Sequence, residues 1–325
     1  MSIASEIQRL QTAKEDIVTA LAAIGINIPS GTTLDEFAEI INPNPALMPL
    51  TFEITSPGVI RWGLVNTAGQ TPLPVASALT IQYSKNGGAW TNLTSSTGNS
   101  APTINVVSGD IVQFRGDNAT YNVYNEETET EGVNVFYSEE WINEEQILYN
   151  TTCGFNLKGN IMSLINSTGF SAMTALEEIC TFNSLFLGCT GLTSANNLIL
   201  PATTLTSSCY GSMFRGCTNL TTAPELPATT LARSCYARMF SRTNLTTAPE
   251  LPATTLAQTC YNAMFEDCVN LNYIKCLATN ISASRATSYW VNGVAASGTF
   301  VKNSSMSLWT TGVNGIPSNW TVQDA

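Results

Sequence analysis

The chain has 325 residues, of which 44% are hydrophobic and only 11% charged. This predicts folded protein whose polar surface comes from Thr, Ser and Asn rather than from charges. The net charge of −11 repels phosphate backbones, so we do not expect nucleic acid as a partner. Histidine is absent, which removes the usual general base and the commonest metal ligand, so we expect neither an enzyme nor a cofactor or metal site.

Residues 1–46 are predicted to be a helical segment for anchoring and oligomerisation. Apolar residues follow 4-3 spacing over three heptads, which predicts a coiled coil, and Leu at a with Ile at d favours a homotrimer. The alternative is a helical hairpin within one subunit, in which Thr33 and Glu36 form a capping box for a second helix. The heptad positions, which we expect to mediate oligomerisation, are Ile3, Ile7, Leu10, Lys14, Ile17, Leu21 and Ile24.

The beginning of the chain carries Glu6, Glu15 and Asp16 among its apolar residues. It therefore lacks the basic and apolar regions of a signal peptide, and we do not expect export through the general secretory route. No segment reaches the length of a membrane span, so membrane insertion is not expected either.

Residues 47–158 are predicted to form an antiparallel β-sandwich. Runs such as "LTFEIT" and "DIVQFRG" show a period of two and are separated by Gly, Pro, Asn and Asp. Asn86 and Gly87 stand between two such runs, which indicates a hairpin because that turn needs positive φ. Eight glutamates lie between Glu126 and Glu145. They indicate either a calcium site or a solvated insertion, and the absence of a calcium-loop pattern favours the insertion.

Residues 159–325 are predicted to form a leucine-rich-repeat solenoid. The sequence "NLTTAPELPATTLA" occupies 219–232 and returns at 244–257, a spacing of 25. Such a period, with Leu at regular places, is typical of stacked coils that share a core. The expected fold class is therefore multi-domain α+β: a helical coiled-coil segment, a β-sandwich and a repeat solenoid. Equivalent aromatic positions in successive coils are Phe186, Phe214, Phe240, Phe265 and Trp290.

Within one coil, "NLTTAP" is predicted to be a strand and "SCYGSMF" a short helix, because Cys209, Met213 and Phe214 fall at i, i+4 and i+5. The repeated phenylalanines should form a ladder. Cys209, Cys235 and Cys260 recur at one place, where we expect buried free thiols rather than disulfides or a zinc site. Neighbouring helices would hold them about 8–10 Å apart, beyond the reach of a disulfide.

The units "CYGSMFRGCTNLTTAPELPATTL" and "CYARMFSRTNLTTAPELPATTL" resemble the BspA-like leucine-rich repeats of gut Bacteroides proteins and their phages. With flanking segments such as "YSKNGGAWTNL", the likeness covers about Leu79 to Val322. The second unit departs from the pattern, since it is one residue shorter and lacks a Cys, so we expect a local irregularity there. The opening "SIASEIQRLQTAKEDI" separately resembles the N-terminal helical segment of phage tail or head fibre proteins.

These resemblances imply a bacteriophage virion structural protein, a head or tail fibre or decoration protein located in the virion. Its N-terminus would bind capsid or tail proteins, and its repeats would bind a host cell-surface glycan or protein. The candidate contacts are Thr222, Thr247, Arg215, Arg238 and Arg242.

Three alternatives to a host-binding virion protein stay open. A BspA-like bacterial surface adhesin would require an export signal and an anchor. A glycan hydrolase would require two acids that converge in a pocket, whereas Glu225 and Glu250 have the spacing of surface residues one coil apart. In a purely structural role, the outer face of the repeats would bind nothing.

Overall fold

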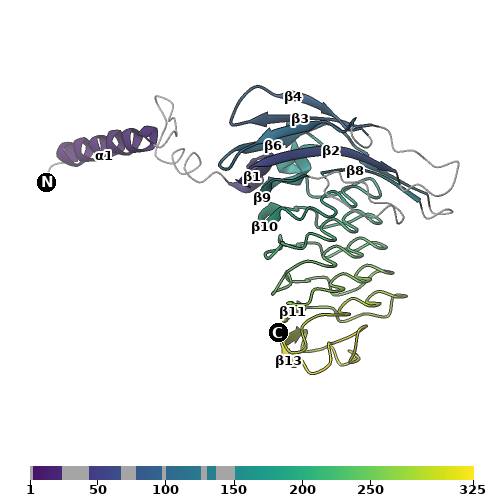
Figure 1. Cartoon of the computed structure of the whole chain (residues 1–325). Helices are drawn as coiled ribbons and strands as arrows, with labels where there is room; N and C mark the ends of the chain where they lie inside the picture. Colours follow the sequence, from purple (N-terminus) through teal and green to yellow (C-terminus); the bar gives the residue numbers. More distant parts are fainter. Residues whose placement is uncertain (1–2, 24–43, 67–77, 97–99, 126–129, 137–150) are drawn as a thin grey trace.

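The computed structural model of the chain describes residues 3–23, 44–66, 78–96, 100–125, 130–136 and 151–325. These residues are mainly β-structure and turns. They contain one α-helix, α1 (Ile3–Ala23), and short 3₁₀ helices at Pro45–Leu47, Ile161–Leu164 and Phe170–Ala172. In Figure 1, α1 lies apart from the main body of the molecule. Within the part of the chain that the structure describes, no helix has the length and apolar character of a membrane span.

The predicted N-terminal coiled coil is wrong, because the described residues contain a single α-helix and a coiled coil needs a second one against its heptad positions. A 4-3 spacing shows that a helix has an apolar stripe, but it does not show what covers that stripe. Of the expected oligomerisation residues, Ile17 is exposed and Lys14 is half-buried. Three expected features lie outside the described residues: the heptad position Ile24, the second helix around Thr33 and Glu36, and most of the Glu-rich insertion.

Two sheets lie near the N-terminal end of the main body (Figure 1). The larger has the strand order β10-β9-β1-β6-β3-β4 and the smaller β5-β2-β8-β7, and all pairings within them are antiparallel except that of β9 with β10. The strands are β1 (Leu50–Ser56), β2 (Gly58–Asn66), β3 (Thr80–Lys85), β4 (Thr91–Thr94), β5 (Thr103–Val106), β6 (Ile111–Arg115), β7 (Asn122–Asn125), β8 (Thr130–Phe136), β9 (Gly154–Asn160) and β10 (Leu192–Ile199).

Aromatic side chains fill the space between the two sheets. The ring centroid of Phe136 on β8 lies 5.0 Å from that of Phe52 on β1 and 4.7 Å from that of Phe114 on β6. The ring of Trp62 on β2 lies 4.8 Å from that of Phe136, and all four side chains are fully buried. The alternation of apolar residues along these strands places one face of each strand in this core.

The hairpin predicted at Asn86 and Gly87 is confirmed. Both residues have positive φ, 53° and 72°, and they connect the antiparallel strands β3 and β4. The side-chain amide of Asn86 donates to Asp110, and its oxygen accepts from the Ile111 N–H, each at 2.8 Å. The hairpin is therefore tied to β6.

The sandwich and the repeats share one sheet and one core. β9 pairs on one side with β1 and on the other, in parallel, with β10, which belongs to the first repeat. The expected boundary between residues 158 and 159 thus falls inside β9. At this junction the chains approach closely, since a Cβ on Gly191 would lie 2.0 Å from the carbonyl oxygen of Cys153.

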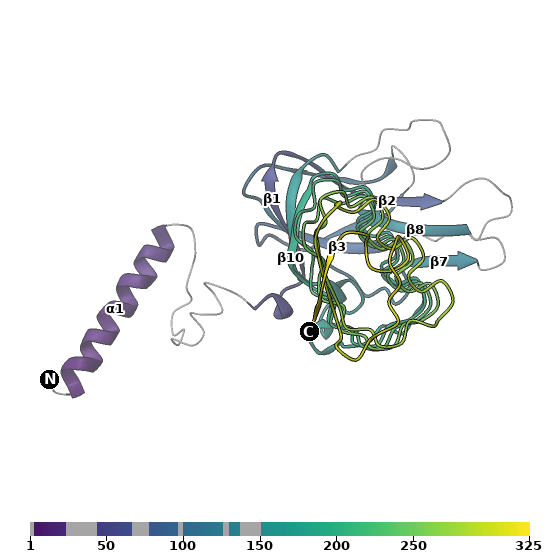
Figure 2. The ribbon, with the colours of Figure 1, turned by 90° about the horizontal axis from the view of Figure 1, so that it is seen from below.

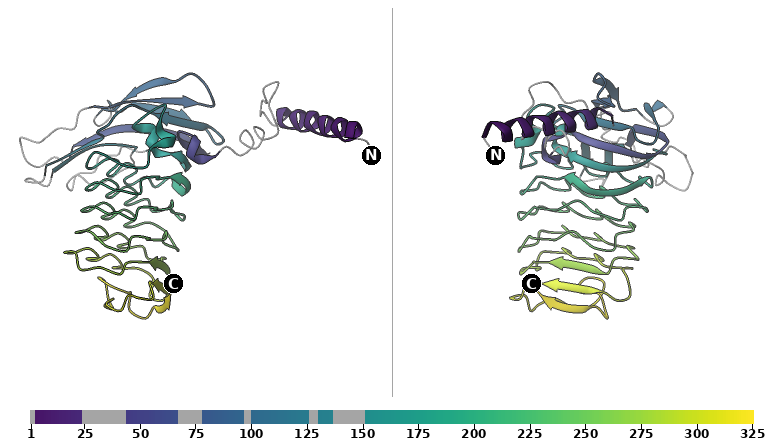
Figure 3. Two further views of the ribbon diagram at one scale, coloured as in Figure 1. Left: turned by 180° about the vertical axis from the view of Figure 1, so that it is seen from behind. Right: turned by 90° about the vertical axis from the view of Figure 1, so that its left-hand side faces the viewer.

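Residues 174–325, here called the stack, form successive layers that superpose when viewed along the column (Figure 2). On one side, parallel pairing joins β11 (Tyr273–Cys276), β12 (Thr299–Lys302) and β13 (Thr321–Asp324), and Figure 3 shows these strands side by side with β10 further up the same side. In the middle layers the pairing is reduced to single bridges, such as Ser194 with Thr222 and Thr247 with Tyr273.

The leucine-rich-repeat solenoid is also contradicted, because the stretches predicted as helices are chains of turns. In the stretch "SCYGSMF", the backbone N–H groups donate alternately to a carbonyl of the same layer and to a carbonyl of the next layer. The Met213 N–H donates to Tyr210 O (3.3 Å), whereas the Phe214 N–H donates to Met239 O (2.9 Å). φ becomes positive at every fourth residue, as at Ser208, Ser212 and Gly216.

The error has a simple physical reason. In the turn stretch the buried residues recur with a period of four, in the pairs Cys209–Tyr210 and Met213–Phe214 followed by Cys217. Over nine residues this period cannot be distinguished from the 3.6 of a helix. Because direct hydrogen bonds join the layers on both sides, the helix spacing of about 8–10 Å does not arise.

Two columns of aromatic rings run through the stack and begin in the sandwich. The Phe column starts at Phe136 and has centroid separations from 5.5 to 6.4 Å, and the predicted phenylalanine ladder within it is confirmed. The Tyr column starts at Tyr121 and has separations from 5.3 to 6.3 Å. Its members are Tyr121, Phe182, Tyr210, Tyr236, Tyr261 and Trp290, while those of the Phe column are Phe136, Phe186, Phe214, Phe240, Phe265 and Trp290.

All nine cysteines are buried free thiols, as predicted for the repeated positions. The expected distance of about 8–10 Å between neighbouring cysteines was wrong, however, since the layers lie closer together than packed helices. The shorter repeat fits without a gap, because Thr243 takes the place of the missing Cys. Its hydroxyl donates to Phe240 O of its own layer at 2.8 Å, whereas the Cys217 thiol donates to Phe186 O of the preceding layer at 3.0 Å.

Candidate interaction surface

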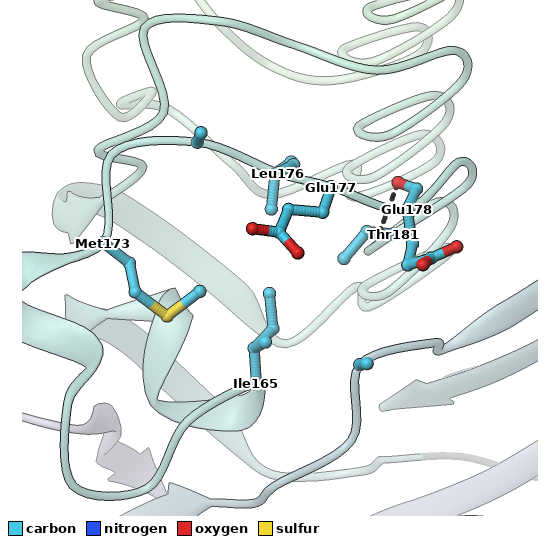
Figure 4. A pocket seen from close by; sticks show the side chains of 8 residues that line it. Ile165, Met173, Leu176, Glu177, Glu178 and Thr181 are labelled. Atoms are coloured by element: carbon cyan, nitrogen blue, oxygen red, sulfur yellow. Dashed lines mark hydrogen bonds between the residues drawn. The ribbon is translucent and has the colours of Figure 1, made fainter.

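A pocket of about 60 Å³ lies where the sandwich meets the first layers of the stack (Figure 4). In this view the Glu177 carboxylate points toward Met173 and Ile165, while that of Glu178 points away. The volume is far below the roughly 300–1,000 Å³ of small-molecule sites, and no second acid faces Glu177 across it. The lining residues are Ala119, Ile165, Met173, Ala175, Leu176, Glu177, Glu178 and Thr181.

A second, open groove of about 430 Å³ runs along α1 and is lined by Gln11, Lys14, Glu15, Val18 and Thr19. Its lining comes from one helix, so it is a surface feature that another polypeptide would have to complete. Among the described residues, no group of three or more Cys, Asp or Glu side chains is arranged to hold a metal ion.

The candidate residues Thr222 and Thr247 lie on the strand side of the stack, and both are exposed. The Thr222 hydroxyl is 2.6 Å from that of Ser194 in the preceding layer. Thr247 pairs with Tyr273 in the following one. These two threonines therefore take part in the contacts that join the layers.

The candidate residues Arg215, Arg238 and Arg242 lie on the turn segments instead, so the structure does not bring all five candidates together. Arg238 and Arg242 are exposed and Arg215 is half-buried. The Gly216 N–H donates to Ser241 O at 2.8 Å, which places Arg215 of one layer beside the residue that precedes Arg242 in the next. Arg242 forms an ion pair with Asp267 at 3.5 Å.

Sequence analysis missed two further arginines in the same turn segments. Arg233 and Arg285 are both exposed. We use the name arginine face for the turn segments 206–217, 232–243, 257–268 and 283–294. Together these segments hold five arginines against two acids, Glu266 and Asp267, a net charge of +3 in a chain whose total is −11. Aligning the repeats by charge as well as by apolar residues would have revealed this set.

Three of the arginines occupy positive-φ positions, which recur at every fourth residue of these turns. Arg238, Arg242 and Arg285 have φ values of 56°, 62° and 52°, in the left-handed region that Gly, Asn and Asp occupy most readily. Gly188, Gly216 and Gly293 fill the position equivalent to Arg242 in other layers. A long cation at this position has a conformational cost that glycine would avoid.

Charge on the strand side is balanced by local pairs. Lys275 lies 2.8 Å from Glu250, and Lys158 and Lys302 form ion pairs with Glu53 and Asp324. The arginine face is therefore the place in the stack where cations outnumber neighbouring acids. Comparisons of this chain with protein-family models, with curated proteins and with solved structures found no match.

Proposed function

We propose that this protein is a structural protein of a bacteriophage virion, a head or tail fibre or decoration protein that binds the host surface through its stack. The resemblance of its opening to phage fibre segments supports this. So does the continuous core that runs from Phe52 in the sandwich to Trp320 in the last layer. Such a core makes a stiff body that projects a repeated surface, which suits binding and assembly rather than catalysis.

The position of α1 apart from this body (Figure 1) supports a separate role for the N-terminal segment. In this proposal, residues 1–46 bind capsid or tail proteins, and the chain forms a homotrimer. Most of the stability of helices in proteins comes from packing against other elements, so a partner that packs against α1 would stabilise it.

Two experiments test these points. Mass spectrometry of purified phage particles should detect the protein as a virion component. Recovery from the bacterial envelope but not from particles would favour a cell-surface adhesin instead. Purified protein added to host cells should also compete with particles for adsorption, because it would occupy the same host ligand. Unchanged adsorption at saturating protein would contradict a host-binding role.

Self-association is measured separately, as the mass of the full chain in solution compared with that of a chain lacking residues 1–46. We expect trimers for the full chain and monomers after the deletion. An oligomer that survives the deletion would show that the sandwich or the stack drives assembly.

A further inference from the structure

The arginine face is distinguished first by its charge. Its net charge of +3 belongs to a chain that carries −11 overall, so it is the part of the stack that attracts anions. A localised patch of this kind draws an anionic ligand to one side of the molecule. Guanidinium groups suit this purpose because their planar donors match the oxygens of carboxylates and sulfates.

Three of the five arginines lie in the layer of residues 232–243, and the other two lie in the layers of residues 206–217 and 283–294. Phe214 lies in the same layer as Arg215, and Phe240 lies in the same layer as Arg242. The centroids of these two rings are 5.6 Å apart. Arg238 and Arg242 occupy equivalent places in successive turns of one layer, since both have positive φ and both donate their N–H groups to the next layer, each at 2.8 Å. The set therefore spreads both along the column and across it, which suits a polymer better than a single small anion.

An exposed aromatic residue belongs to the same surface. Tyr289, two layers below Arg238 at the equivalent position, is 58% exposed and also has positive φ, 55°. A tyrosine ring has an apolar face and a polar edge, so it can contact a sugar ring while nearby arginines bind acidic groups.

Nucleic acid is the other polyanion to consider, and the chain as a whole disfavours it. The negative charge of the remaining surface repels a dense phosphate backbone, and five arginines offset by two acids provide few phosphate contacts. A polysaccharide with one acidic group on each sugar or on every second sugar has a lower charge density than duplex DNA, so the remaining surface repels it less.

We propose that the arginine face binds an acidic polysaccharide, with Arg238 and Arg242 contacting its carboxylate or sulfate groups and Tyr289 contacting a sugar ring. This inference rests on the proposed function, of which it specifies the ligand class and the site. It also assigns the threonines on the strand side, Thr222 and Thr247, to joining the layers rather than to ligand contact.

The test measures binding of the full-length protein to four polymers: polygalacturonate, which carries one carboxylate on each sugar, κ-carrageenan, which carries one sulfate on every second sugar, neutral dextran and duplex DNA. We expect the two acidic polysaccharides to bind, the stronger of them identifying the anionic group, and the affinity to fall with added salt. Equal binding to neutral dextran, or tighter binding to DNA, would overturn the proposal.

Variants locate the site. Replacing both Arg238 and Arg242 by Gln should weaken binding by roughly tenfold or more, because charge-assisted hydrogen bonds are lost. Arg9→Gln is the matched control, since Arg9 is an exposed arginine on α1, and it should bind like the wild type. If the control weakens binding as much as the double variant, the arginine face is not the site.

A variant that should strengthen polymer binding keeps the test valid even if the double variant folds poorly. Asp267→Asn removes the acid beside Arg242, and Asn accepts the positive φ of 59° at this position. It should tighten polymer binding by about twofold to threefold, as expected for a partly exposed charge. No gain would contradict the site. If the protein is a virion component that competes for adsorption but binds neither acidic polymer, this inference fails while the proposed function stands.

Discussion

Two buried tyrosines of the Tyr column differ in what surrounds their hydroxyl groups. The Tyr121 hydroxyl donates to Leu164 O at 2.6 Å, whereas the buried Tyr210 hydroxyl has no hydrogen-bond partner among the described residues. A buried polar group without a partner carries the cost of its lost hydration. Burial raises the pKa values of both residues, so both stay neutral at physiological pH.

Replacing each tyrosine by Phe should therefore have opposite effects. Tyr121→Phe should lower the free energy of unfolding by about 1–2 kcal/mol, because the Leu164 carbonyl loses its donor. Tyr210→Phe should leave it unchanged or raise it by up to about 1 kcal/mol, because only an unpaired hydroxyl is removed. Urea unfolding followed by circular dichroism measures both. Equal losses for the two variants would show that the Tyr210 hydroxyl has a partner after all.

Asp110 links the β3–β4 hairpin to the rest of the sandwich and gives stability a dependence on pH. Its hydrogen bond with Lys85, at 2.7 Å, and those from the Val107 N–H and the Asn86 amide lower its pKa to about 2. An unfolded Asp titrates near about 3.9. The stabilisation is therefore fully present above that value and is lost as the pH falls toward 2.

Asp110→Asn should lower the melting temperature at neutral pH, because the charge-assisted bonds with Lys85 and the Val107 N–H are weakened. The difference between wild type and variant should shrink as the pH falls from about 4 to about 2. Thermal unfolding at a series of pH values measures it. A difference that stays constant down to pH 2 would mean that the loss arises from packing and not from charge.

At the scale of the layer, three successive turn segments repeat the same buried residues, namely Cys, Tyr, Met and Phe. Phe240 is fully buried between Phe214 and Phe265, with ring separations of 5.6 and 5.9 Å. Backbone hydrogen bonds hold the layers at a fixed spacing, so a gap in the Phe column cannot close by collapse of its neighbours. A truncation in the column should therefore cost nearly the full cavity penalty.

Phe240→Ala should lower the free energy of unfolding by about 3–5 kcal/mol. Arg233→Ala, in the same layer but exposed, is the control and should change it by less than about 0.5 kcal/mol. Denaturant titration of both variants gives the comparison. A loss below about 1 kcal/mol for Phe240→Ala would mean that the column is loosely packed.

At the scale of the whole molecule, the sandwich and the stack are expected to unfold together, since they share β9, both aromatic columns and a single core. Cysteine labelling reports on both halves. Cys153 lies at the junction, while Cys260 and Cys276 lie deep in the stack. Burial raises the pKa of the Cys153 thiol to about 11 and those of Cys260 and Cys276 to about 12.

In the native protein these thiols should resist alkylation at mildly alkaline pH, because each is inaccessible and protonated. With increasing denaturant, Cys153 and the stack cysteines should become reactive at the same midpoint, as peptide mapping by mass spectrometry would measure. Labelling of the stack at a clearly lower denaturant concentration would show that it unfolds independently of the sandwich.

The sequence by itself determined the local features whose causes lie within a few residues. Asn86–Gly87 defined a hairpin because that turn needs positive φ, and alternation in "LTFEIT" defined a strand with one buried face. The spacing of 25 aligned the phenylalanines and the cysteines correctly, because identical segments in a stack meet identical neighbours.

Tertiary structure decided what short-range patterns leave open. A burial period of four at Cys209, Met213 and Phe214 fits a helix as well as a chain of turns, and the choice depended on hydrogen bonds to the next layer, 25 residues away. The heptads of α1 defined an apolar stripe but not what covers it. The proximity of Arg215 to Arg242 likewise arises only when the layers stack, since residues of successive repeats become surface neighbours through backbone pairing between layers.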